Sequence, residues 1–251
     1  PIPVAPGLYG KLPIVGDFVS RRLPASFIQR WDTWLQEALS ASREQLGAEW
    51  LEIYLTSPIW RFVLSSGNCG DDASAGILMP SVDKVGRYFP LTLAAMIQKS
   101  EALPHLFVTA ANWFDELEQL ALHALEGDVN LDAFDSKLQN QFLTLPLPLG
   151  RKPNSEKRHD RNNSDLVFRT EMEKLELIPE ALLEMSACML ARFFPGYSLW
   201  STNGSENMKP SFLVYSGLPP AKAFSGLLTG VWQRYEGSGP STDSISLTKM
   251  G

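Results

Sequence analysis

Two long segments of the chain carry apolar residues at the three- and four-residue spacing of an amphipathic helix. The first stripe comprises Phe27, Ile28, Trp31, Trp34, Leu35, Ala38 and Leu39. We expect Ser26 to cap this helix and Gly47 to end it. The second helix is expected from about 107 to 125, with Gly127 after it. Because Trp31 and Trp34 lie on the buried stripe, they are predicted to belong to the core rather than to a cofactor site.

Shorter runs predict β-strands at 59–64, 75–79 and 88–97, and their short connections favour an antiparallel meander. Strand alternation places Trp60 and Phe62 on one face of the first strand and Arg61 on the other. We therefore expect the two aromatic residues in the core and Arg61 at the surface.

The remaining pattern completes an α/β fold, with a mixed, largely antiparallel sheet flanked by helices. A short β-like piece is expected at 8–12, helices at 132–141, 179–193 and 221–228, and a β-hairpin from 197–202 and 212–216. We predict a single domain over residues 1–235. Within it, a basic, weakly hydrophobic run at about 150–165 is expected to be a mobile loop, and residues 236–251 a polar C-terminal tail.

Composition narrows the classes of function. The chain has 251 residues, 44% of them hydrophobic, and a formal net charge of −6. An acidic chain gains no general attraction to nucleic acid, so we expect no nucleic-acid partner. No run approaches the roughly 18 apolar residues that span a bilayer, and no secretory signal is recognisable, so we expect a cytoplasmic protein without membrane insertion. Cys69 and Cys188 are expected to be reduced thiols, although their sequence positions do not exclude a disulfide.

Motifs for catalysis and metal binding are incomplete. Gly7 to Leu12 resembles a P-loop but is too short and ends in leucine where a hydroxyl is required. The three histidines have no metal-ligand spacing, so no metal or cofactor is expected. Ser81 and Lys84 match S-x-x-K, the serine–lysine pairing of penicillin-binding enzymes, which requires a helix and a Lys-Thr-Gly partner. The segment lies between Pro80 and Gly86, which disfavours a helix, and the partner motif is missing. A serine hydrolase that uses Ser81 and Lys84 is therefore kept only as an alternative.

Charged residues within the Gly-, Pro- and aromatic-rich segments of the first ninety positions are the candidates for partner binding. They are Asp17, Arg21, Arg61, Asp83, Lys84 and Arg87. Two interpretations are open at this point. The charges could form internal ion pairs that order loops, for example Asp17 or Asp83 with Arg61 or Arg87. They could equally form an exposed surface that recognises a partner.

Several motifs, taken in order, carry a resemblance to a known family. They are Tyr9-Gly10-Lys11-Leu12-Pro13 with Gly16-Asp17-Phe18, Trp31-Asp32-x-Trp34-Leu35, Ser57-Pro58-Ile59-Trp60-Arg61-Phe62, and Met79-Pro80-Ser81-Val82-Asp83-x-Val85-Gly86-Arg87-x-Phe89-Pro90. Together they resemble the TagF family, accessory proteins encoded with bacterial type VI secretion systems. The resemblance is strongest from Gly7 to Phe134.

The resemblance implies an α/β fold and a cytoplasmic regulator without catalytic activity. TagF proteins act as post-translational repressors of type VI secretion and are thought to bind the forkhead-associated scaffold protein of the apparatus. The family pattern supplies no catalytic residue for these positions. A structural component of the secretion apparatus is a further alternative.

Overall fold

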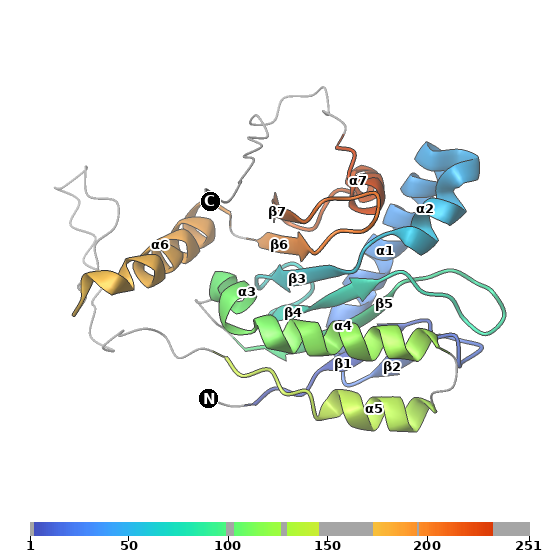
Figure 1. The fold of residues 1–251 in the computed structure, drawn as a ribbon, viewed down its shortest axis with the longest axis horizontal. Coiled ribbons are helices and arrows are strands. Elements are labelled where there is room, and N and C mark those ends of the chain that lie inside the picture. The colour runs from blue at the N-terminus through green and yellow to red at the C-terminus, as the bar shows by residue number, and fades with distance from the viewer. Residues whose placement is uncertain (1–2, 99–102, 127–129, 146–172, 195, 233–251) are drawn as a thin grey trace.

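The computed structural model describes residues 3–98, 103–126, 130–145, 173–194 and 196–232. Within these residues, seven strands form one sheet in the order β2-β1-β5-β4-β3-β6-β7 (Figure 1). Each pair of neighbouring strands with a defined register is antiparallel. The predicted α/β class is therefore confirmed.

The strands have the following bounds: β1 Gly7–Gly10, β2 Val19–Arg21, β3 Trp60–Leu64, β4 Ala73–Met79, β5 Leu91–Ile97, β6 Tyr197–Thr202 and β7 Ser211–Ser216. The α-helices are α1 Ala25–Leu46, α2 Trp50–Thr56, α3 Leu106–Thr109, α4 Ala111–Leu125, α5 Leu131–Gln139, α6 Ile178–Phe193 and α7 Phe224–Thr229. Short 3₁₀ turns occupy Gly47–Glu49, Leu103–His105, Leu175–Leu177 and Ala221–Ala223.

The sheet is covered on both faces, which gives two apolar clusters. Helices α1, α2 and α7 pack on one face around Trp31, Phe62 and Trp200, which are fully buried; we call this the α1-side cluster. Helices α4 and α5 pack on the other face around Phe114 and Phe134, which belong to the α4-side cluster (Figure 1). Strand alternation explains the division, because Phe62 of β3 lies in the first cluster and its neighbour Val63 in the second.

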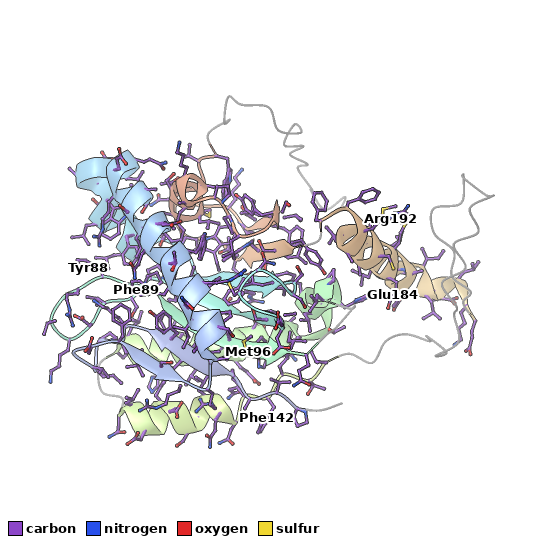
Figure 2. All side chains as sticks on the ribbon, turned by 180° about the vertical axis from the view of Figure 1, so that it is seen from behind. Tyr88, Phe89, Met96, Phe142, Glu184 and Arg192 are labelled. Carbon is purple, nitrogen blue, oxygen red and sulfur yellow. The ribbon has the colours of Figure 1, made fainter. Side chains whose placement is uncertain are left out.

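Helix α6 is an exception to this layered packing. Figure 2 shows α6, with Glu184 and Arg192, extending beyond the helices that cover the sheet. Within α6, Ala187 is the one buried residue, and the partly buried Leu190 packs against the α4-side cluster. Near its middle, the Glu184 carboxylate lies 3.9 Å from the ring of the buried His105.

Most of the predicted elements are confirmed, with three local corrections. The first helix begins after Pro24, so Ser26 is not its cap. The second predicted helix is two helices, because the backbone of Ala110 leaves the helical region between α3 and α4. The strand predicted from 88 begins at Leu91, since residues 88–90 belong to a loop.

The remaining predictions concern the two tryptophans, the two cysteines and the predicted loop and tail. Trp31 and Trp34 are core residues, as predicted. Cys69 and Cys188 are not joined by a disulfide, and burial raises the pKa of the Cys69 thiol to about 12. The basic run at 150–165, the tail at 236–251 and both ends of the predicted domain lie outside the described residues.

Candidate partner-binding site

Two loops that carry most of the candidate residues leave the sheet side by side. One comprises residues 11–18 between β1 and β2, and the other residues 80–90 between β4 and β5. Because β1 pairs with β5 and β5 with β4, Gly10, Met79 and Leu91 bring the loops to one end of three adjacent strands. We call residues 11–18 and 80–90 together the loop pair.

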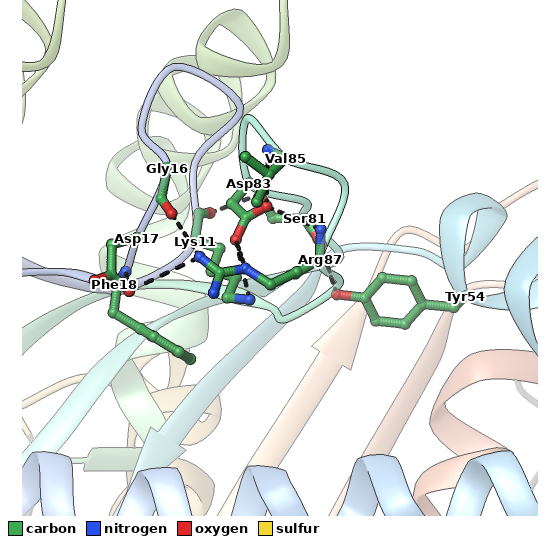
Figure 3. A network of polar contacts seen from close by, with 9 residues as sticks. All are labelled: Lys11, Gly16, Asp17, Phe18, Tyr54, Ser81, Asp83, Val85 and Arg87. Carbon is green, nitrogen blue, oxygen red and sulfur yellow. Dashed lines mark hydrogen bonds and ion pairs between the residues drawn. The ribbon is translucent and has the colours of Figure 1, made fainter.

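The Asp83 carboxylate is the centre of the loop pair (Figure 3). One oxygen, Oδ1, accepts hydrogen bonds from the amides of Val85 at 3.0 Å and Arg87 at 2.9 Å. The other, Oδ2, lies 2.7 Å from Nε of Arg87 and 3.1 Å from Nζ of Lys11. The Asp83 side chain is 0% exposed. It is therefore a buried acceptor that joins the two loops.

The electrostatic surroundings keep Asp83 ionised. Burial alone would raise the pKa of its carboxyl, since a charged group loses hydration. The hydrogen bonds from Arg87, through both amide and guanidinium, and those from Lys11 and Val85 outweigh burial. They hold the pKa of Asp83 well below its ordinary value, which favours the ionised, ion-paired carboxylate.

Lys11 is a site residue that sequence reasoning missed. Its ammonium is almost fully buried beside Asp83 and lies 5.0 Å from the centre of the Phe18 ring. That ring also packs against Phe89, with centroids 4.8 Å apart, and remains partly exposed. Lys11 and Asp83 are 72 positions apart, so no spacing in the sequence signals this pair.

Arg87 fastens the second loop to the first. Besides its bond to Asp83, its guanidinium donates a hydrogen bond to the carbonyl of Gly16 and lies 4.0 Å from the Asp17 carboxylate (Figure 3). The side chain remains about half exposed. The internal ion pair between Asp83 and Arg87 that was one of the two interpretations is thus present, and Arg87 still reaches the surface.

The turn at 83–86 presents the side chains of Lys84 and Val85 to solvent. Its backbone is held by hydrogen bonds from the Gly86 amide to the Asp83 carbonyl and from the Lys84 amide to the Val15 carbonyl, both 3.0 Å. Gly86 adopts a φ of 85°, a conformation that favours glycine. The Lys84 side chain is exposed, and Val85 is 67% exposed. These two side chains project from a rigid base.

Ser81 has a structural role that does not fit the S-x-x-K alternative. It is 2% exposed, and its hydroxyl donates to the Lys11 carbonyl at 2.7 Å. Its backbone amide and carbonyl both bond to the buried Tyr54 hydroxyl at 3.0 Å (Figure 3). The segment is a turn, not a helix, so the spacing does not place Ser81 and Lys84 on one helix face.

The predicted exposure of Arg61 is wrong. Arg61 does lie on the opposite face of β3 from Trp60 and Phe62, but helix α4 covers that face and leaves the arginine side chain 12% exposed. The guanidinium donates hydrogen bonds of 2.6 Å to Asp115 and Glu118. Burial alone would lower its pKa, but these bonds outweigh that effect and raise it. Arg61 is an anchor for α4 and is not brought to the loop pair.

The remaining candidates lie at the surface. Asp17 is exposed and accepts a hydrogen bond from the Phe18 amide. Arg21 is exposed on β2, where its guanidinium donates to the Ser20 carbonyl. Its neighbour Arg22, with a φ of 58°, forms a two-bond ion pair with Asp135 of α5. The surface of the loop pair therefore combines Asp17, Phe18, Lys84, Val85 and Arg87, with Arg21 on the adjoining strand.

The described residues contain neither a cluster of metal-binding side chains nor a membrane-spanning helix. No group of three or more His, Cys, Asp or Glu side chains there could hold a metal ion. None of the helices in the described part of the chain combines the length and apolar character needed to span a membrane.

Comparison with known proteins identifies the family. No curated protein matches the chain. Among solved structures, the chain is similar to PA0076 from Pseudomonas aeruginosa PAO1, with a TM-score of 0.76 and 36% sequence identity over 96% of this chain and all of that one. The model of the TagF N-terminal domain, described as type VI secretion system-associated, matches residues 7–141, which is more than half of the chain and includes both loops. The chain therefore belongs to the TagF family of type VI secretion system-associated proteins.

Proposed function

We propose that this protein is a non-catalytic, cytoplasmic repressor of type VI secretion that acts after translation by binding the forkhead-associated scaffold protein of the apparatus. The observation that carries the proposal is the TagF match over residues 7–141, which contains the whole loop pair. The partner is inferred from the activity expected of the family, and the loop pair is the surface that we propose for binding it.

The construction of the loop pair supports a binding role. A loop that is ordered before binding loses less conformational entropy when a partner docks. Here the buried Asp83, Lys11 and Tyr54 groups fix the backbone, while Phe18, Lys84 and Val85 stay exposed on it. Exposed aromatic and arginine side chains, here Phe18 and Arg87, are enriched at protein-recognition surfaces, and loops on a rigid scaffold commonly bind partners.

The role of Ser81 supports the absence of catalysis at this site. A nucleophilic serine needs an accessible hydroxyl whose proton passes to a neighbouring base. The Ser81 hydroxyl is buried and donates its proton to a backbone carbonyl. A serine-directed activity probe is expected to leave the protein unlabelled, and labelling lost in Ser81→Ala would contradict the proposal.

Affinity purification from the native cell tests the partner. We expect the forkhead-associated scaffold protein to co-purify with the tagged chain, and deletion of the chain to raise secretion without changing the amounts of apparatus proteins. Co-purification with baseplate proteins in its place would favour the structural alternative. Unchanged secretion after deletion would contradict repression.

A further inference from the structure

The two edges of the sheet differ in how they are protected. An edge strand presents unpaired backbone groups that can pair with another strand, and proteins usually block this with short strands, charges or irregular backbone. Edge strand β2 uses all three devices. It has three residues, carries the charged Arg21, and is followed by Arg22 with a positive φ.

Edge strand β7 has none of these devices. It has six residues, Ser211–Ser216, with no charge and no proline, and it keeps an unbroken register with β6 along its length. Along β7, Phe212 and Val214 are 59% and 45% exposed on one face. On the other face, Leu213 and Tyr215 pack against the α1-side cluster. In the described structure β7 is the last strand of the sheet on this side.

We propose that β7 is a homodimerisation edge, on which the β7 strand of a second copy adds antiparallel to extend the sheet across a two-fold axis. In such a pair the two-fold axis is perpendicular to the sheet and keeps each side chain on the same face of the sheet. Two residues that lie opposite each other across the axis must therefore belong to the same face of β7. A pairing centred on Leu213 meets this condition. It sets Phe212 of each copy opposite Val214 of the other.

This register is self-complementary. An aromatic residue opposite a β-branched residue is among the favourable cross-strand pairs, and the two-fold axis forms the pair twice. The alternative centred on Val214 sets Phe212 opposite Ser216 and keeps one apolar pair on this face, Val214 with its own copy, in place of two. Phe107 packs edge-on against Phe212, with ring centroids 5.8 Å apart, so the Phe212 ring is supported within its own chain.

The lack of charge on β7 is compatible with pairing between two copies. In the register centred on Leu213, no like charges face each other across the new seam. The exposed Phe212 and Val214 are each other's partners in this register, so a second copy covers both apolar side chains. One six-residue strand buries less than the roughly 800 Å² per partner of a standard interface. The dimer is therefore expected to be weak, with monomer and dimer exchanging as concentration changes.

Sedimentation equilibrium of the whole chain over a range of concentrations tests this proposal. We expect wild type to pass from monomer to dimer, and Val214→Lys, which sets a charge on the edge, to weaken the dimer at least about tenfold. Val85→Lys, the same change at an exposed valine of the loop pair, is the matched control and is expected to dimerise as wild type does.

Two outcomes would overturn the proposal. One is a wild type that is monomeric at all concentrations, and the other is dimerisation of Val214→Lys with wild-type affinity. If wild type is monomeric and the melting temperature falls in Val214→Lys but not in Val85→Lys, the edge is covered by other residues of the same chain.

Discussion

Asp83 and Arg61 belong to the same set of charges in the sequence, yet they are fixed in different kinds of structure. Asp83 lies in a loop and is surrounded by donors from two loops, so its burial orders a surface. Arg61 lies in the middle of the sheet and is held by two carboxylates of α4, so its burial fixes a helix. The comparison teaches that the two interpretations of the charges are not exclusive. A buried ion pair can be the base on which exposed side chains are presented.

The largest effect is expected when Asp83 is changed to alanine. The change leaves the Lys11 ammonium buried without its carboxylate and removes the acceptor of the Arg87 and Val85 amides. An unpaired buried charge is strongly destabilising. We expect the greatest loss of unfolding free energy among the variants discussed here, measured by urea denaturation. Asp17→Ala, at an exposed carboxylate of the same loop pair, is the control. Equal denaturation midpoints for the two variants would contradict the structural role of Asp83 in joining the two loops.

Arg61→Ala is expected to lower the free energy of unfolding by about 3 kcal/mol, the low end for breaking a buried ion pair, because Asp115 keeps access to water. Arg21→Ala, at an exposed arginine with a backbone partner, should change it by no more than about 0.5 kcal/mol. The two variants are compared by urea denaturation. Similar values for both would show that Arg61 does not anchor α4.

Acid is expected to remove the contribution of Asp83 to the free energy of unfolding. The folded-state pKa of Asp83 lies below its unfolded value of about 3.9, so its contribution to stability is present above that pH and is lost as pH falls further. The gap in unfolding free energy between wild type and Asp83→Asn should therefore narrow as pH drops below about 4. A gap that stays constant down to about pH 3 would contradict a lowered Asp83 pKa.

Lys84→Glu is expected to have the smallest effect on stability, within about 0.5 kcal/mol, because the side chain is exposed and its structural contact is through the backbone. Thermal unfolding of the variant checks this directly. A fall of the midpoint comparable to that of Arg61→Ala would place Lys84 among the structural groups of the loop pair.

The sequence was informative where contacts are local or periodic. Apolar spacing predicted α1 and the β3–β4–β5 meander because one buried face repeats along each element. The Asp83–Arg87 pair was among the ion pairs that the sequence left open, and the structure contains it. Lys11 beside Asp83 was not predicted, because the two residues lie in loops 72 positions apart. The cover of α4 over Arg61 was not predicted either, because strand alternation assigns a residue to a face without showing what covers that face.

The loop pair is tested most directly as the binding surface by calorimetry, which measures the affinity of the purified forkhead-associated scaffold for Lys84→Glu and for wild type. Lys137→Glu, the same reversal at an exposed lysine of α5, is the control. We predict that wild type and Lys137→Glu bind alike and that Lys84→Glu binds at least about tenfold more weakly, a loss of about 1.4 kcal/mol. Equal affinities for all three proteins would contradict the loop pair as the binding surface, and no binding by wild type would contradict the proposed partner.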